Sequence, residues 1–151
     1  MRPVLLLQIM SHDKQIDSFL NLVTTIVFLL GRLMLGGFFI HSGYHHFRDL
    51  NMMSGYAKSK GIPAPSAAVG FTGLLLLFGG LSIIFGAYPT AGIISIIIFL
   101  VPVSFTMHNF WTMTDAMQKS VERVNFLKNM AILGASLMFL AIPQPWSCSI
   151  M

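Results

Sequence analysis

The residues that could do chemistry in this chain are one arginine, several histidines, two amides and a lysine. The candidates are Arg32, His41, His46, His108, Asn109, Lys128 and Asn129. Histidine titrates near neutral pH and can move protons. Arginine, lysine and asparagine supply hydrogen-bond donors for an anion or a carbonyl oxygen. Together these side chains suit the binding of a small electron-rich ligand, with a histidine to handle protons.

Arg32 lies in the middle of the apolar run FLLGRLMLGGFFI. A charge at mid-span costs at least about 2.5 kcal/mol even on lenient insertion scales, so its donors need acceptors. None of the five acidic residues lies in an apolar run, and no carboxylate is expected to pair with it. Its donors then go either to backbone carbonyls and hydroxyls such as that of Ser136, as in a structural arginine, or to a bound ligand. The sequence leaves both interpretations open.

The other candidates have ordinary explanations as well. His45 and His46 fit solvated residues of an interfacial loop, and Lys128 fits a lysine that extends to the membrane surface. His41 and His108 lie nearer the apolar runs and are the better candidates for proton handling. Histidines at unknown separation make no metal-site signature, and no Cys/His pair has zinc-site spacing, so we expect no metal.

The composition predicts an integral membrane protein. Of the 151 residues, 55% are hydrophobic and 9% are charged, and the mean hydropathy is +0.76. An ordinary soluble domain carries about 25% charged residues, so this chain could not cover its own surface in water. The net charge of +4 is scattered rather than gathered in a basic stripe. This pattern excludes nucleic acid as a partner and leaves the lipid bilayer.

Four apolar stretches approach the length of a membrane helix, which needs about 20 residues. They predict an all-α integral membrane protein, a four-transmembrane-helix bundle with spans at about 19–40, 67–86, 91–107 and 127–142. Residues 1–18 are expected to form a short amphipathic lead-in rather than a cleavable signal peptide. Residues 19–146 then make a single membrane domain, and residues 147–151 make a short tail.

An even number of spans places both termini on one side of the membrane and the loops 41–66 and 108–126 together on the other. Six lysines and arginines lie near the spans on the loop side, and two lie on the terminal side. The positive-inside rule then favours cytoplasmic loops and external termini. The same topology brings the histidines, Asn109, Lys128 and Asn129 to one end of the bundle.

Glycines recur at spacings that let helices approach closely in lipid. The residues of the first span that follow i, i+4 and i+7 spacing are Arg32, Gly36, Phe39, Gly43 and His46. If the helix continues beyond residue 40, they share one stripe, which we assign to the bundle interior. Gly73 and Gly80 lie seven residues apart in the second span. We expect these two glycines, with Gly36 and Gly43, to serve helix packing or to leave room for a ligand.

The chain resembles the DoxX family of small four-span membrane proteins, because four of its segments match the family's motifs in the same order. The matching segments are GRLMLGGFFIHSGYHHF, YAKSKGIPAPS, HNFW and FLKN, which occur in the family's order over about residues 28–142. Where the family often has a lysine after the Ser-Gly of the first motif, this chain has His45 and His46 nearby. The resemblance implies a multi-pass protein of the bacterial inner membrane. It also implies a link, in some members, to thiosulfate oxidation with quinone as the electron acceptor.

Two hypotheses of function follow. The first is a redox-linked oxidoreductase subunit that binds a quinone or a small sulfur anion near Arg32 and the loop-side polar residues. The chain has a single cysteine and no haem or flavin motif, so a soluble or membrane redox partner must supply the electrons. The alternative is a non-enzymatic membrane scaffold or assembly factor for a partner complex. A small transporter is disfavoured, because four spans leave little room for a substrate path unless the chain forms a homo-oligomer.

Overall fold

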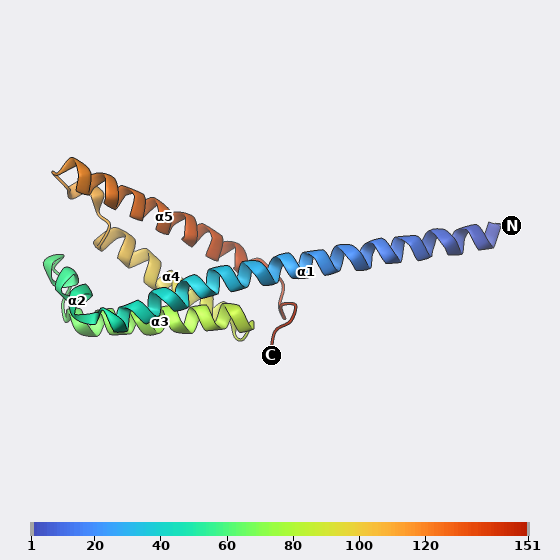
Figure 1. Ribbon diagram of the computed structural model, residues 1–151, viewed down its shortest axis with the longest axis horizontal. Helices are drawn as coiled ribbons and strands as arrows, with labels where there is room; N and C mark the ends of the chain where they lie inside the picture. The colour runs from blue at the N-terminus through green and yellow to red at the C-terminus, as the bar shows by residue number, and fades with distance from the viewer. Residues whose placement is uncertain (1, 151) are drawn as a thin grey trace.

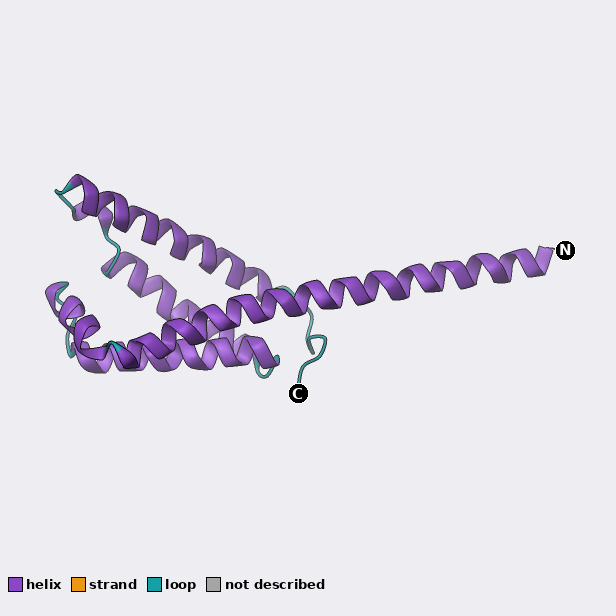
Figure 2. Ribbon diagram, in the orientation of Figure 1, coloured by secondary structure: helices purple, strands orange, loops and turns teal. Residues whose placement is uncertain are grey.

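The computed structural model describes residues 2–150, and the side chains of residues 12–150. All regular elements in this part of the chain are helices (Figure 1 and Figure 2). They are α1 (Arg2–Arg48), α2 (Leu50–Ser59), α3 (Pro65–Phe85), α4 (Pro89–Thr106), the short 3₁₀ helix η1 (Phe110–Thr112) and α5 (Ala116–Leu140). The prediction of an all-α protein is confirmed.

Three segments are long and apolar enough to cross a membrane, at His12–Arg48, Pro65–Phe85 and Pro89–Thr112. They correspond to the first three predicted spans. The predicted fourth span at 127–142 falls on α5, which is not among them, because the first half of this helix is rich in charged side chains. The chain is thus an all-helical, multi-pass membrane protein, and the fourth span stays a prediction.

α1 is one continuous helix where the sequence predicted a lead-in, a span and the start of a loop. Its 47 residues extend about 70 Å at 1.5 Å per residue, more than twice the hydrocarbon thickness of a bilayer. No proline occurs between residues 4 and 62, and an isolated glycine costs a helix only about 1 kcal/mol. The half nearer the N-terminus extends beyond the other helices (Figure 1), and the side chains of residues 12–24 are all exposed.

Both predicted loops are partly helical. The segment 41–66 contains the last turns of α1 and then α2, and the segment 108–126 contains η1 and the first turns of α5. α5 begins early because Asp115 caps it, and the carboxylate of Asp115 accepts the backbone N–H of Gln118 at 2.7 Å. Most side chains of the two segments are therefore held on helices and can make defined contacts.

The helices pack in a row rather than in a closed ring. α3 is central and contacts α1, α2 and α4, while α4 in turn contacts α5. Within residues 2–150, no Cα atom of α1 lies within 8 Å of one in α5. The loop-side ends of these two helices lie apart in Figure 1. At the opposite end the rings of Phe28 on α1 and Phe139 on α5 lie 5.8 Å apart between centroids, so the bundle is open between α1 and α5 at the loop side only.

The core lies where α1, α3 and α4 meet. Its buried members are Phe39, Leu76, Ile83, Ile93, Ile96, Leu100 and Trp146. Trp146 directly precedes the predicted tail, and residues 147–150 fold back on the helices, since the N–H of Ile150 donates to the carbonyl of Phe85 at 3.1 Å. The predicted tail is thus part of the packed structure at the end of the bundle opposite the loops.

Glycines let α1 and α3 pack with their backbones almost in contact. A Cβ atom added at Gly36 would lie 2.7 Å from the carbonyl oxygen of Gly80, and one at Gly80 would lie 2.7 Å from that of Gly36. Gly43 faces Gly73 in the same way, at 2.9 Å. The four glycines singled out in the sequence therefore lie on the α1–α3 contact. This close approach holds α1 against α3 and sets the position of the histidines at its end.

Candidate functional site

Arg32 is fully buried, and each of its three nitrogens donates to a backbone carbonyl. Nε donates to Ile83 at 2.9 Å, Nη2 to Ile84 at 2.7 Å and Nη1 to Ser147 at 2.6 Å. Ile83 and Ile84 lie in the last turn of α3, where carbonyls have no intrahelical partner. Arg32 therefore caps α3 and ties it to both α1 and the tail.

The surroundings of Arg32 match those of a structural arginine, which is one of the two interpretations that the sequence left open. The rings of Phe28 and Trp146 lie 5.7 and 5.5 Å from its guanidinium carbon, at the distance of cation–π contacts. The hydroxyl of Ser136 instead donates to the carbonyl of Ile132 at 2.9 Å. Arg32 lies where α3 ends, whereas the histidines lie where α3 begins. The structure thus does not bring Arg32 together with the loop-side candidates.

Four of the loop-side candidates line one cavity of about 240 Å³, which we call the polar cavity. They are His46, His108, Lys128 and Asn129. Residues of α1, α2, α3, α4 and α5 all line it. The cavity thus lies at the loop-side opening between α1 and α5 and gathers residues from all five α-helices.

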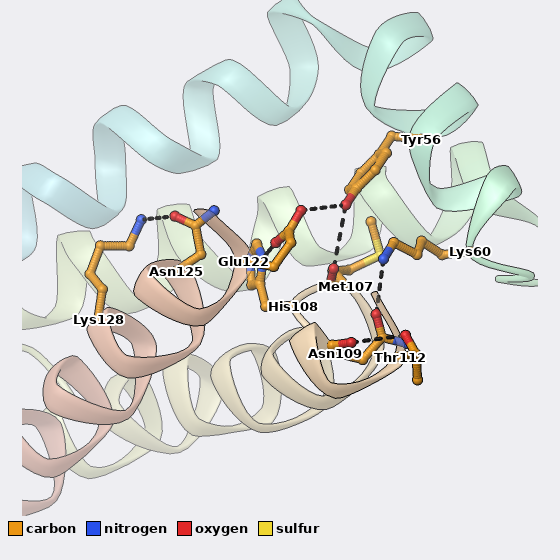
Figure 3. Close-up of polar contacts among 9 residues, drawn as sticks. All are labelled: Tyr56, Lys60, Met107, His108, Asn109, Thr112, Glu122, Asn125 and Lys128. Atoms are coloured by element: carbon orange, nitrogen blue, oxygen red, sulfur yellow. Dashed lines mark hydrogen bonds and ion pairs between the residues drawn. The ribbon is translucent and has the colours of Figure 1, made fainter. Parts of the chain in front are cut away.

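Two other candidates lie outside the polar cavity. His41 is exposed on α1, with its ring centroid 4.5 Å from that of His45. Asn109 accepts a hydrogen bond from Nζ of Lys60 at 2.9 Å (Figure 3). In the described part of the chain, no three His, Cys, Asp or Glu residues are grouped so as to hold a metal ion.

Two buried side chains give the polar cavity its chemistry. His46 is 8% exposed, and its Nδ1 lies 2.8 Å from the carbonyl oxygen of Ser42. Asn129 is 7% exposed, and within residues 12–150 its amide makes no hydrogen bond. The amide of Asn129 is therefore a hydrogen-bonding group that the fold leaves free for a molecule in the cavity.

Glu122 holds a polar network beside the polar cavity (Figure 3). Its Oε2 lies 2.7 Å from Nδ1 of His108, and its Oε1 accepts the hydroxyl of Tyr56 at 2.9 Å. Glu122 is itself only 8% exposed. Since Tyr56 lies on α2, His108 follows α4 and Glu122 lies on α5, this one carboxylate joins three elements.

The network keeps Glu122 ionised and Tyr56 neutral near pH 7. Burial acts to raise the pKa of Glu122, but hydrogen bonds from His108 and Tyr56 outweigh it and lower that pKa below the ordinary value of 4.5. Burial raises the pKa of Tyr56 to about 12, with help from the hydrogen bond to Glu122 and its negative charge. The carboxylate is thus a fixed acceptor and the phenol a fixed donor.

Acidification is expected to weaken this network. The pKa of Glu122 is lower in the folded state than in the unfolded state. Its ionised carboxylate therefore stabilises the fold above the unfolded-state pKa, and this stabilisation is lost as the pH falls through the folded-state pKa. The melting temperature of the wild type in detergent should fall between about pH 5 and pH 3, and that of Glu122→Gln should fall less. Asp49→Asn is the control, because it removes a more exposed histidine–carboxylate pair, with 2.7 Å between His45 and Asp49. Parallel pH profiles for the wild type and Glu122→Gln would contradict this role.

A second cavity of about 680 Å³, which we call the apolar cavity, adjoins the first. Side chains of α2, α3 and α4 form nearly all of its wall, and they are mostly apolar. The two cavities share His46, Met53, Tyr56, Phe99, Val103 and Met107 as lining residues. Exposed Met52, Phe71 and Ile98 also line the apolar cavity, so it reaches the surface of the bundle. The two cavities are therefore neighbours, and the smaller one holds the four candidate residues named above.

Sequence reasoning missed Glu122 and gave Tyr56 no role in the site. Tyr56 falls where an aromatic belt at the membrane interface is expected, and this explanation hid its contact with Glu122. A signal for Glu122 is present in α5, where Glu122, Asn129 and Ser136 are each seven residues apart and all buried. This spacing places them on one face of the helix. A search for polar residues at heptad spacing would have found that face.

Comparison with known proteins gives one match. The model of the DoxX family matches residues 27–109, which is more than half of the chain. The matched segment includes His46, Tyr56 and His108, whereas α5, with Glu122 and Asn129, lies beyond it. No curated protein and no solved structure matches the chain.

Proposed function

The chain belongs to the DoxX family, and on that premise we propose that it is a redox-linked subunit that binds a quinone at the loop-side end of its bundle. The quinone ring occupies the polar cavity, and the isoprenoid tail lies in the apolar cavity. The sequence offers no redox cofactor site of its own. A soluble or membrane partner oxidoreductase therefore exchanges electrons with the bound quinone.

The observation that carries this proposal is the unpartnered amide of Asn129. Its side chain is 93% buried and lines the polar cavity, and it has no hydrogen-bond partner in the described part of the chain. An oxygen of a quinone ring can accept from the amide N–H₂, and a quinol hydroxyl can also donate to the amide oxygen. Lys128 lines the same cavity, and its ammonium, which donates to Oδ1 of Asn125 at 3.3 Å, has further hydrogens that can serve as a second donor.

The size and lining of the apolar cavity favour a quinone over a small sulfur anion. A cavity of about 680 Å³ with an apolar wall suits a hydrocarbon chain and gives no hydrogen bonds to an anion. Arg32, the side chain that would best hold an anion, already donates to three carbonyls. Because the two cavities share six lining residues they lie side by side, and we propose that one amphipathic molecule extends from one into the other.

Quinone binding tests the proposal directly. The detergent-solubilised protein is titrated with a benzoquinone that carries a ten-carbon tail and with the same ring without a tail. We expect the tailed form to bind and to raise the melting temperature more. Asn129→Leu should lower its affinity about tenfold, whereas Asn51→Leu, at an exposed site on α2 that lines neither cavity, should not change it. If neither quinone binds, the proposal fails and the scaffold alternative gains support.

The membrane and the orientation are part of the same proposal. We place the protein in the bacterial inner membrane with its loops in the cytoplasm, since six lysines and arginines lie near the spans on the loop side and two on the terminal side. Both cavities lie toward the loop side of the bundle. A partner that exchanges electrons with the quinone would then dock from the cytoplasm or within the membrane at that end.

A further inference from the structure

We propose that the polar cavity selects the reduced, hydroxyl-bearing form of its ligand, because two histidines present it with unprotonated ring nitrogens. This inference rests on the proposed quinone site and specifies which redox form that site prefers. It concerns hydrogen bonding only and requires no electron transfer. The two histidines are His46 and His108, and in each the hydrogen bond made by Nδ1 decides the state of Nε2.

The tautomer of His46 follows from its contact with Ser42. A backbone carbonyl oxygen can only accept, so Nδ1 of His46, 2.8 Å from that oxygen, must carry the hydrogen. In the neutral imidazole Nε2 then has a lone pair and no hydrogen. The ring is 92% buried and lies with its edge against Phe99, at 5.7 Å between ring centroids. His46 therefore brings a hydrogen-bond acceptor to the wall of the cavity.

The tautomer of His108 follows from Glu122 in the same way. The ionised carboxylate only accepts, so Nδ1 of His108, 2.7 Å from Oε2, must be the donor. Glu122 does not line the polar cavity, whereas His108 does. The edge of the ring that carries Nε2 is therefore the one left for the cavity. In neutral His108 this nitrogen is also an acceptor.

Two acceptors distinguish a quinol from a quinone. Each quinol hydroxyl can donate to an unprotonated Nε2, whereas a quinone carbonyl oxygen has only lone pairs and would face the lone pair of the nitrogen. Asn129 and Lys128 can donate to the oxygens of either form, so they add affinity without discriminating. The two histidines are thus the specificity-determining pair, and Glu122 is a positioning residue that acts through His108.

Glu122→Gln should reverse the role of His108. Tyr56 donates to Oε1 at 2.9 Å, so the amide oxygen of glutamine is favoured on that side and the amide N–H₂ faces His108. The amide then donates to Nδ1, and the hydrogen of the imidazole moves to Nε2. The same ring nitrogen would then donate to a carbonyl oxygen, which favours the quinone.

Two measurements test this inference. The affinities for the ten-carbon-tailed benzoquinone and for its chemically reduced quinol are compared at about pH 8, above the range in which histidine ordinarily titrates. The wild type should bind the quinol about tenfold tighter, and Glu122→Gln should lose or reverse that preference. Asp49→Asn, which removes the carboxylate from His45 outside both cavities, should keep it. Nitrogen-15 NMR of the imidazole rings should report hydrogen on Nδ1 of His46 and His108 in the wild type, and on Nε2 of His108 in Glu122→Gln.

The outcomes separate this inference from the proposed function. If both redox forms bind the wild type equally, or the quinone binds tighter, the inference is overturned and the quinone site stands. Hydrogen on Nε2 of either histidine in the wild type would also overturn it, whether or not any quinone binds. If neither form binds, both proposals fail. The wild-type measurements decide the matter even if Glu122→Gln does not fold.

Discussion

Replacing Arg32 with methionine is expected to lower the free energy of unfolding by about 3–5 kcal/mol. The change removes three charge-assisted hydrogen bonds at 2.6 to 2.9 Å and leaves three carbonyls without their donor. Two of these carbonyls belong to the last turn of α3, and the third belongs to the tail. The end of the bundle opposite the histidines should therefore loosen as a unit.

Thermal melting in detergent measures this loss. Arg48→Met is the matched control, because Arg48 is an exposed arginine on the same helix and its replacement should change stability by no more than about 0.5 kcal/mol. Arg32→Lys should fall between, since an ammonium lacks the planar fork of donors that reaches three acceptors. If Arg32→Met melts like the wild type but no longer binds quinone, Arg32 serves a ligand and the structural role is wrong.

Replacing Gly36 with alanine is expected to lower the free energy of unfolding by about 1–3 kcal/mol through overpacking. The added methyl carbon would lie 2.7 Å from the carbonyl oxygen of Gly80, and backbone cannot move aside as a flexible side chain can. The nearby Cγ1 of Ile84, at 2.5 Å, would have to shift as well. α1 and α3 must then separate, which weakens the contact that runs from Gly36 to Gly43.

Gly37 offers an adjacent control for this prediction. A Cβ atom at Gly37 meets nothing within 4 Å, so Gly37→Ala should be neutral or raise stability by up to about 1 kcal/mol through helix propensity. The two variants are compared by thermal melting in the same detergent. Equal effects on the melting temperature at both positions would show that helix propensity, rather than the α1–α3 contact, determines how these glycines affect stability.

Much of the fold could be predicted because apolar length is a strong signal. Runs of about 20 apolar residues mark the three helices that are long and apolar enough to cross a membrane. The continuation of α1 to Arg48 could not be predicted, because the polar residues from His41 onward suggest a loop. Gly43 packs closely against Gly73 in this part of α1, and such a contact between distant segments leaves no local pattern.

The sequence could predict the candidate site only as far as the order and number of the membrane spans define it. An even span count places His46, His108, Lys128 and Asn129 at one end of the bundle, and the polar cavity contains all four. Arg32 shows the limit of this reasoning. The sequence places Arg32 in the middle of its own apolar run, whereas its partners lie at the end of α3, and only the α1–α3 packing brings them to it.

The three acceptors of Arg32 also impose an order on biosynthesis. Ile83 and Ile84 are synthesised 51 and 52 residues after Arg32, and Ser147 follows it by 115 residues. At roughly 5–20 residues per second, the ribosome needs about 10 s to reach that last acceptor. Throughout that time the first hydrophobic segment carries a cation whose final set of partners is incomplete. The insertion machinery, or water, must solvate Nη1 of Arg32 at least until Ser147 has been translated.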